Sequence, residues 1–469
     1  MGGRAHQALE QAHTRSTADG SWLWKSGVPR RRKDTGTLDD NDRKSDEATV
    51  KKFVVAQIGA RRGYAVPAIL EKAGMLERFY TNITGDIDLG KFFSAAAVLP
   101  FLRKPARRLA GRRLPSNIRA KTTTFPCLTL MHILRRAFIK RNPVASFRGA
   151  MRFSNALGRA MARQGFGNAT HIYSMLGECG PLLAAAKERG LTVVSEVYIP
   201  LSTERILAEE RKKFPDWEAN VPDFSAIRRK LGVEDTLLKL SDYFICPSEM
   251  AQEDLIANWG IQRKRTVLVP YGVNPELLSV RNDPVRGRVL FAGTAELRKG
   301  IHYFAMAAEK LVARGRRYEF RVAGNVQRSI ANQKHCRYLT FLGRVPRADM
   351  TREFAAADLF VMPSLAETGP EVNYEALACG VPVVTTPEAR AVVRDGIEGR
   401  IVPARDPDVL ADAIIEIIED REKRDRIARA SRERARDFTW ACYGERLVSA
   451  LKSFDGVEND SVATWKLRS

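Results

Sequence analysis

The 469-residue chain lacks several features that would define its class at once. It has no run of 18 or more apolar residues, and its longest apolar stretch, residues 92–102, is too short to span a bilayer and contains Pro100. Residues 1–50 are polar and charged throughout, so we expect no secretory signal there. The six cysteines are scattered without CxxC spacing, and the six histidines form no ligand cluster. We therefore expect reduced thiols, a cytoplasmic location and no metal.

Acidic residues are missing from one long segment. Of the 77 Lys and Arg, 17 lie in residues 89–177, which contain no Asp or Glu. The rest of the chain holds the other 60 Lys and Arg and all 55 Asp and Glu, so it contributes only +5 of the net charge of +22. In this segment Arg pairs alternate with Leu, Phe, Ile and Pro, a pattern that favours an anionic membrane surface. An acidic polysaccharide ranks second, and nucleic acid third because no nucleic-acid-binding motif supports it.

The length of the chain predicts two domains, since 469 residues exceed one ordinary core. The 44% hydrophobic content is that of a soluble globular protein. We predict a disordered N-terminal tail, a first domain that contains a basic insertion at 89–170, a second domain, and a C-terminal helix with a tail. Their respective bounds are 1–50, 51–280, 281–437 and 438–469.

Short apolar strands alternate with helices in both halves of the chain. Strands are predicted at 51–58, 171–175, 191–198, 242–248 and 266–272, and then at 288–293, 318–324, 339–345, 359–364, 381–386 and 399–404. Helices are predicted at 66–76, 180–190, 302–315, 372–380, 421–436 and 438–453. The helix at 421–436 is so highly charged that we expect it to be solvated. This alternation predicts an α/β protein with two Rossmann-like, doubly wound parallel sheets that have helices on both faces.

Polar residues follow the predicted strand at 288–293, where ligands of open α/β sheets bind. Gly293 and Thr294 leave the strand, and Arg298 and Lys299 come immediately before the next helix. Two cations, free backbone N–H groups and a helix dipole suit a diphosphate. The alternative is a solvated loop whose basic residues have no function.

The strand at 359–364 leads into a second polar loop. Glu367 lies in this loop, and Glu375 lies one turn into a helix that Gly380 ends. Each carboxylate can accept hydrogen bonds from sugar hydroxyls, one from a transferred sugar and one from a ribose. Surface acids on a helix are the alternative, but the full pattern PS-x2-E-x7-EALACG-x-PVV, on a strand–loop–helix–strand frame, is far more specific than two acids alone.

An ordered series of motifs carries a family resemblance. The series is SDYFICPSEMAQEDL (241–255), VLVPYGVN (267–274), FAGTAELRKGIHY (291–303), FLGRV (341–345), AADLFVMPSLAETGPEVNYEALACGVPVV (356–384) and VRDGIEGRIVPARDPDVLADAI (393–414). Over residues 53–455 the chain resembles retaining glycosyltransferases of family 4. The resemblance implies the GT-B fold, with two domains facing a cleft and a C-terminal helix that returns to the first domain. It also implies transfer of a sugar from a nucleotide-diphosphate donor to an acceptor hydroxyl, without a metal or cofactor. Many members act on lipid-linked or membrane-bound acceptors, in polysaccharide or glycolipid synthesis.

The resemblance also assigns roles to individual residues. Lys299 contacts the donor diphosphate, Glu367 binds hydroxyls of the transferred sugar, and Glu375 binds the nucleotide ribose. Arg298, a further catalytic candidate, could supply from a different position the cation that the family often has directly after Gly293. Ser248 and Gly272 help to shape the cleft between the domains. The further donor-binding candidates are Gly293, Thr294, Gly369, Glu371, Gly59 and Gly63.

Three departures separate this chain from the usual family pattern. Thr294 follows Gly293 where the family often has Arg. Thr368, Gly369 and Pro370 stand where it usually has Gly-Phe-Gly, and Pro370 has no N–H to offer a phosphate. The first domain often presents a histidine near the reacting sugar, whereas the strand at 191–198 carries Glu196.

The first domain offers weaker candidates for the acceptor side. In the loop GARRGY (59–64), the glycines permit close approach of a ligand and Arg61 and Arg62 could meet a phosphate. Glu196 either faces the acceptor or is a buried structural acid, and burial favours the second. His171 begins a strand and is more simply a core or edge histidine.

Two rival functions remain open from the sequence. One is a non-catalytic protein that binds nucleotide sugars or anionic polymers, which the altered loop after Glu367 permits. The other is a phosphorylase-like reaction on the same fold, although no lysine stands in a setting that resembles a pyridoxal phosphate site.

Overall fold

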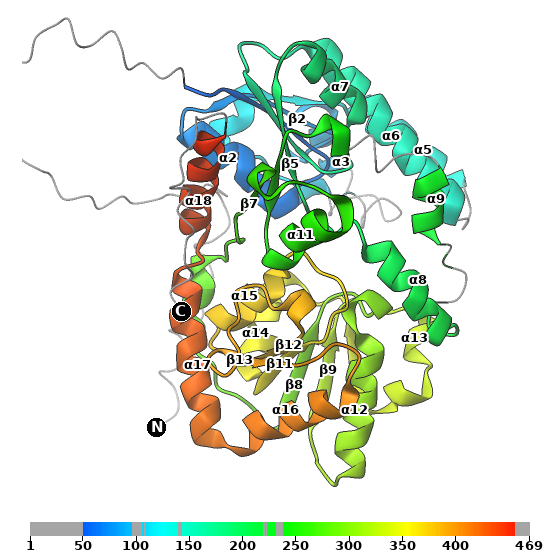
Figure 1. Cartoon of the computed structure of the whole chain (residues 1–469), viewed down its shortest axis with the longest axis vertical. Coiled ribbons are helices and arrows are strands. Elements are labelled where there is room, and N and C mark those ends of the chain that lie inside the picture. Colours follow the sequence, from blue (N-terminus) through cyan, green and yellow to red (C-terminus); the bar gives the residue numbers. More distant parts are fainter. Residues whose placement is uncertain are drawn as a thin grey trace, which may run out of the picture.

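The structure is a computed structural model, and it describes residues 50–454 apart from 96–105, 107–108, 139–142, 219–220, 222 and 231–237. The predicted N-terminal tail, except for its last residue, and the chain beyond 454 lie outside the described residues. Figure 1 shows two α/β domains, one above the other, with the C-terminal helices running along one side of both. Among the described helices, none is long and apolar enough to cross a bilayer.

The first domain contains a parallel sheet of seven strands in the order β3-β2-β1-β4-β5-β6-β7. The chain moves outward from β1 to β3, returns beside β1 as β4, and then moves outward on the other side. The direction of winding therefore changes between β1 and β4, which is where such sheets bind ligands. The strands are β1 (Phe53–Gln57), β2 (Leu76–Thr81), β3 (Thr122–Thr124), β4 (His171–Met175), β5 (Thr192–Glu196), β6 (Tyr243–Cys246) and β7 (Thr266–Leu268).

Five of these strands were predicted, and β2 and β3 were missed. The predicted helix at 66–76 is too long, because α2 ends at Lys72 and Gly74 takes the left-handed conformation (φ 69°) before β2 begins. Half-buried Glu77 and Arg78 interrupt the apolar pattern of β2. β3 consists of three half-buried threonines at the edge of the sheet, so it has no apolar signal.

The second domain contains a parallel sheet of six strands in the order β10-β9-β8-β11-β12-β13, and all six were predicted. Here the winding changes direction between β8 and β11. Alternate residues of β8 point into different cores, since Val289 and Phe291 join one apolar cluster and Leu290 joins another. The strands are β8 (Arg288–Ala292), β9 (Glu319–Ala323), β10 (Leu339–Gly343), β11 (Leu359–Met362), β12 (Val383–Thr385) and β13 (Gly399–Ile401).

Helices cover both faces of each sheet, so the predicted fold class is confirmed. The helices of the first domain are α2 (Ala65–Lys72), α3 (Asp88–Ala95), α5 (Pro126–Phe138), α6 (Pro143–Gln164), α7 (Gly180–Glu188), α8 (Thr203–Lys213), α9 (Phe224–Lys230) and α11 (Glu249–Glu253). Those that follow are α12 (Ile301–Ala313), α13 (Arg328–Ala331), α14 (Arg347–Ala356), α15 (Glu371–Ala378), α16 (Pro407–Glu419), α17 (Arg421–Arg436) and α18 (Trp440–Ser453). Short single turns are η2 (Arg61–Tyr64), η4 (Ser116–Lys121), η5 (Asp254–Asn258), η6 (Arg263–Arg265), η7 (Pro275–Ser279), η8 (Leu297–Lys299), η9 (Lys334–Tyr338) and η10 (Pro387–Ala389).

Helix α17 has the predicted bounds but is not a solvated helix on all sides. Ile427 is buried in the core, and Arg424 is only 3% exposed. Arg424 and Arg421 both pair with the buried carboxylate of Asp358, at 3.0 and 2.8 Å. The predicted solvated face is the one with Asp425, Arg426 and Arg429, whereas on the other face Arg421 and Arg424 neutralise a buried acid just before β11.

Helix α18 leaves the second domain and packs against α2 of the first, as the resemblance implied (Figure 1). The two segments that connect the domains lie side by side, since the Val273 N–H donates to Phe438 O at 2.7 Å. A Cβ on Gly272 would lie 2.9 Å from Thr439 O, so glycine permits this close approach.

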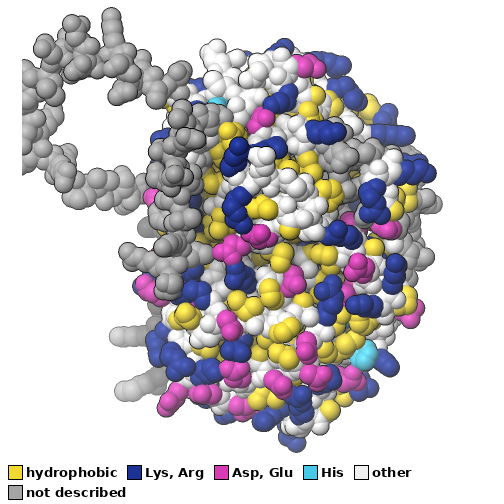
Figure 2. Space-filling model, viewed as in Figure 1, with side chains coloured by type: hydrophobic (Ala, Val, Ile, Leu, Met, Phe, Trp, Pro, Cys, Tyr) yellow, Lys and Arg dark blue, Asp and Glu magenta, His cyan; other side chains and the backbone are white. Residues whose placement is uncertain are grey.

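The charges are unevenly distributed over the two domains. On the face shown in Figure 2, Asp and Glu side chains gather over the second domain, in the lower half, whereas Lys and Arg cover both halves. Within the basic insertion, α6 exposes four arginines, which are Arg148, Arg152, Arg159 and Arg163.

The start of α12 provides a test of the fold near the loop that follows β8. Gly300 has φ 70°, and a Cβ there would lie 1.9 Å from Pro363 O. Gly315, after the other end of α12, has φ 76°, but a Cβ there would meet no described atom within 4 Å. We expect Gly315→Ala to lower the free energy of unfolding by about 1 kcal/mol through backbone strain alone. Gly300→Ala should lower it by more than about 2 kcal/mol because the clash adds to the strain.

Chemical denaturation of both variants measures this difference. Equal losses would mean that the contact between the start of α12 and the end of β11 is looser than the structure indicates.

Candidate functional site

Loops at the carboxyl ends of strands from the two sheets meet between the domains. Thr368, in the loop after β11, donates its hydroxyl to Tyr198 O of the first domain at 2.9 Å. A Cβ on the neighbouring Gly369 would lie 3.4 Å from Pro247 O, which follows β6. The carboxyl ends of strands from both sheets therefore face one region, where the rule for open sheets places a ligand.

The loop after β8 brings two cations to one carboxylate. Arg298 Nη1 lies 2.7 Å from Glu367 Oε1, and Lys299 Nζ also pairs with that oxygen. Glu296 pairs with the other side of Arg298 at 2.8 Å. Burial opposes the charge of Arg298, but Glu367 and Glu296 outweigh it and raise the pKa of the guanidinium. The structure thus brings together the three residues that the sequence assigned to catalysis.

Backbone contacts hold the two loops of this cluster together. The Leu365 N–H donates to Arg298 O at 2.8 Å, and Arg298 Nη1 donates to Ala366 O at 3.2 Å. At the exit of β8, Gly293 has φ 137°, and a Cβ on nearby Gly324 would lie 1.7 Å from Gly293 O. Thr294 follows in the same loop. Both glycines allow a close approach of backbone at this edge of the sheet.

Two further carboxylates lie on one face of α15. Glu371 is its first residue, and Glu375 follows one turn later. Burial raises the pKa of Glu371, although Arg62 and Arg347 act against it. Burial also raises the pKa of Glu375 to about 7, because Arg347, 3.7 Å away, only partly offsets it. An acid in this state can accept or donate a hydrogen bond near neutral pH.

The first-domain loop after β1 is strained. Arg62, Gly63 and Tyr64 are left-handed in succession, with φ of 48°, 61° and 65°. Two of them are not glycine, a feature that concentrates at functional sites. Gly59 is also left-handed (φ 83°), and a Cβ on Gly59 or on Gly63 would meet no described atom within 4 Å. These two glycines therefore leave room beside the loop.

The two arginines of this loop have different surroundings. The Arg62 side chain is 6% exposed, pairs with Glu196 and lies 4.3 Å from the centre of the Tyr271 ring. Arg61 is 32% exposed, pairs with Glu178 at 2.5 Å, and lies over the Tyr198 ring. Arg61 is thus the more accessible of the two to a ligand.

Glu196 is fully buried and accepts hydrogen bonds from Tyr271, at 3.0 Å, and from Tyr173. It is therefore the buried acid of a polar network, which was the favoured alternative. Glu178 and Tyr271 were not predicted, although both follow strands of the first sheet, and this position is the signal that could have identified them.

His171 does not join this site, so its assignment to the acceptor side is wrong. It begins β4, and the amino ends of parallel strands lie at the edge of the sheet opposite to the site. Its ring lies 4.8 Å from that of Phe53, the first residue of β1, and its Nδ1 is 2.7 Å from Thr170 Oγ1. Ser248 has a structural role, because its hydroxyl accepts the Ala251 N–H at the start of α11.

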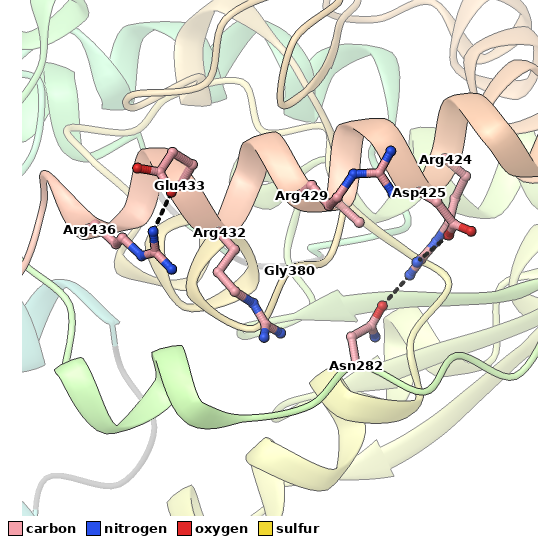
Figure 3. A pocket seen from close by; sticks show the side chains of 9 residues that line it. Asn282, Gly380, Arg424, Asp425, Arg429, Arg432, Glu433 and Arg436 are labelled. Atoms are coloured by element: carbon pink, nitrogen blue, oxygen red, sulfur yellow. Dashed lines mark hydrogen bonds and ion pairs between the residues drawn. The ribbon is translucent and has the colours of Figure 1, made fainter.

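A pocket of about 440 Å³ lies elsewhere, between α17, Asn282 and Gly380 (Figure 3). Most of its arginines are already engaged. Arg436 pairs with Glu433 at 2.5 Å, and Arg432 donates to Cys379 O at 3.0 Å. This pocket lies at the carboxyl end of α15, whereas Glu371 and Glu375 lie toward the other end. In the part of the chain that the structure describes, no group of three or more His, Cys, Asp or Glu could hold a metal ion.

The comparisons agree with this geometry. Residues 286–420 match the model of the family described as Glycosyl transferases group 1, so the second domain is a domain of that family. This match supports the glycosyltransferase resemblance over the second domain, and the two parallel sheets agree with the predicted GT-B fold.

Two curated relatives give the level of sequence similarity. The chain is 32% identical over 222 residues to a phosphatidyl-myo-inositol mannosyltransferase of Mycolicibacterium smegmatis, which covers 44% of this chain and 57% of that protein. It is 25% identical over 237 residues to a D-inositol 3-phosphate glycosyltransferase of Paenarthrobacter aurescens, with coverage of 45% and 58%. The matches therefore span somewhat more than half the length of these relatives.

Two solved structures share the fold. Sucrose-phosphate synthase from Thermosynechococcus elongatus superposes with a TM-score of 0.60 at 17% identity, covering 86% of this chain and 98% of that one. Anabaena HepE in complex with UDP gives a TM-score of 0.56 at 16% identity, covering 86% and 100%.

Glu375 makes stability depend on pH. Burial raises its pKa from 4.5 to about 7, so the unfolded chain ionises Glu375 at lower pH than the folded chain does. Above pH 4.5 the unfolded chain loses the Glu375 proton while the folded chain still holds it. The free energy of unfolding therefore falls as the pH rises toward 7. Glutamine does not ionise, so the free energy of unfolding of Glu375→Gln should not show this fall. Relative to the wild type, it should rise by about 2 kcal/mol between pH 4.5 and pH 8.

Urea denaturation at the two pH values measures this gain. Asp349→Asn, which removes a 49% exposed carboxylate of α14, is the control and should follow the wild type. Parallel behaviour of Glu375→Gln and the wild type would show that Glu375 ionises normally.

Proposed function

We propose that the protein is a retaining, metal-independent glycosyltransferase that moves a sugar from a nucleotide-diphosphate donor to an acceptor hydroxyl. The observation that carries this proposal is the ion cluster of Arg298, Lys299 and Glu367, which joins the loops at the β8/β11 switch point. The names of the curated relatives, both of which act on inositol compounds, support a glycan or lipid-linked acceptor. The UDP bound in the HepE structure supports a nucleotide donor.

The geometry suggests how these residues act. The donor diphosphate lies at the start of α12, against Arg298, Lys299 and the loop N–H groups. As the bond between the sugar and the diphosphate breaks, negative charge grows on the leaving oxygen, and these cations stabilise it without a metal. Glu367 accepts hydrogen bonds from hydroxyls of the sugar, and Glu375 does so from the ribose. Catalysis then consists mainly of positioning and charge stabilisation, and we assign no covalent nucleophile.

The acceptor enters from the first domain. The loop 59–64 and Tyr198 border the region that faces Glu367, and Arg61 is the partly exposed cation there. Retention of configuration is inferred from the family resemblance. A non-catalytic protein that binds nucleotide sugars is the alternative, since Pro370 cannot donate the N–H that the family usually supplies.

A thermal-shift panel of UDP, GDP, ADP and their common sugar conjugates tests the donor site. A ligand that binds the folded state at a hundred times its Kd adds about 2.7 kcal/mol of stability. We expect one nucleotide series to raise the Tm of the wild type and to lose its effect in Glu375→Ala. Sugar transfer should fall at least about a hundredfold in Glu367→Ala.

Sugar transfer by the wild type, together with its loss in Glu367→Ala, would exclude the non-catalytic alternative. Nucleotide binding without any turnover in the wild type would favour the non-catalytic alternative. A Tm that no nucleotide changes would contradict the donor site.

We also propose that the protein is cytoplasmic and binds peripherally to an anionic membrane through the basic insertion. Helices α3 and α5 are in contact and expose apolar side chains, which are Leu89, Phe92, Met131, Ile133 and Leu134. Leu134 is 62% exposed, and Arg135 and Arg136 follow it. Apolar side chains beside cations suit the boundary between headgroups and acyl chains. Acidic polysaccharide is the second candidate.

Sedimentation with vesicles tests this surface. We expect binding to vesicles with anionic phospholipid and little to neutral phosphatidylcholine, with weakening by salt. The double variant Ile133→Ser and Leu134→Ser should bind about tenfold more weakly, because each change removes a side chain that would be buried in lipid. Ile397→Ser, which changes a 42% exposed side chain of the second domain, is the control.

Equal losses in the two variants would argue against this surface. Binding of an acidic polysaccharide in place of vesicles would favour the second candidate.

A further inference from the structure

One segment of the first-domain chain is built into the second domain. Residues 203–218, here called the arm, follow β5 in the sequence and include α8. Leu207 and Trp217 of the arm belong to the same apolar core as β8 and α12. Ser329 Oγ donates to Trp217 O at 3.0 Å, and Gln333 Nε2 donates to Asp216 O at 3.0 Å. In Figure 1, α8 accordingly lies beside the second domain.

A buried carboxylate anchors the middle of the arm. Glu210 is fully buried and accepts hydrogen bonds from Tyr303 at 2.6 Å, Arg405 at 2.9 Å and His302 at 3.0 Å. Burial alone would raise the pKa of Glu210, but these three hydrogen bonds outweigh it and lower the pKa to about 2. His302 and Tyr303 lie in the first turn of α12, directly after the loop with Arg298 and Lys299. The arm is therefore fixed against the helix that this loop begins.

The end of the arm reaches the loop itself. The side chain of Glu218 is 7% exposed, and its Oε1 accepts the Leu297 N–H at 2.8 Å. Its Oε2 is held by Arg211 Nε of the same arm at 3.1 Å. Leu297 is the first residue of η8 and immediately precedes Arg298 and Lys299. One side chain of the arm thus fixes the backbone from which both cations project.

We propose that Glu218 is a positioning residue of the donor site, which sets Arg298 and Lys299 for the diphosphate through the Leu297 amide. This role rests on the proposed function. Apart from the short turn η8, the loop between Gly293 and Gly300 is irregular. Its backbone hydrogen bonds to other segments of the second domain include Ala295 N to Asn325 O at 2.8 Å and Leu365 N to Arg298 O at 2.8 Å. Two long cationic side chains bind a diphosphate tightly only when the backbone that carries them is held in place.

Three variants separate positioning from stability. Glu218→Ala removes the acceptor of the Leu297 N–H, and Glu218→Gln keeps a carbonyl oxygen in its place. Arg211→Met removes the ion pairs with Glu218 and Glu204 but keeps the acceptor of the Leu297 N–H. Isothermal titration of the full chain measures Kd for UDP, GDP or ADP, whichever the wild type binds, and for the matching nucleoside monophosphate.

We expect Glu218→Ala to weaken diphosphate binding about tenfold and monophosphate binding much less. Glu218→Gln and Arg211→Met should stay within about threefold of the wild type for both ligands. Hydrogen exchange of the peptide 293–301 should become faster in Glu218→Ala and remain slow in Arg211→Met. This exchange reports on the loop independently of ligand binding.

Two results would overturn the inference. If the wild type binds a diphosphate and Glu218→Ala binds it equally well, Glu218 does not position the cations, and the proposed function is unaffected. Equal losses for diphosphate and monophosphate in all three variants leave Glu218 a purely structural residue. If the wild type binds none of the diphosphates, the proposed function and this role fail together.

Discussion

The site depends on one carboxylate held between two cations. Glu367 is 7% exposed, and Arg298 and Lys299 from the preceding switch-point loop both pair with it. A buried acid without partners would cost several kcal/mol, so this acid requires the loop after β8 to lie where it does. The same pairs connect the exits of β8 and β11, the two strands between which the winding of the sheet reverses. The ion cluster and the topology therefore support each other.

Small residues make this arrangement sterically feasible. Gly300 lets the start of α12 approach Pro363, and Gly324 lets β9 end against Gly293. These contacts bring the positive end of α12 next to the loop that carries Glu367, so the helix dipole and the cations act on one region. The backbone and the charges thus converge on a place suited to a diphosphate.

The second half of the chain was predictable from sequence because its strands are short and mostly apolar, and β8, β11 and β12 are almost entirely buried. All six strands of the second sheet were predicted from their apolar runs. Arg298, Lys299 and Glu367 were predicted because they follow the strands at 288–293 and 359–364. The first half was less predictable, since β2 carries Glu77 and Arg78 and β3 consists only of threonines. Residues that act through distant contacts were also hidden. Glu218 meets Leu297 across 79 positions, and periodicity carries no information on such a pair.

The contacts between the domains differ in kind according to their place. The arm joins the apolar core of the second domain through Leu207 and Trp217 and reaches the site loop through Glu218, whereas α18 packs on α2 of the first domain. Polar ties also connect the domains: buried Thr368 donates to Tyr198 O, and Arg390 pairs with Glu249, with both side chains of that pair 44% exposed. Polar ties in partly wet surroundings can be exchanged for ligand contacts at little net cost, whereas apolar ties cannot. Near the site the domains are also joined by apolar contacts, because Tyr271 of the first domain and Tyr374 of α15 belong to one buried cluster. The ties that a ligand could exchange are therefore the partly exposed polar ones, such as Arg390 with Glu249.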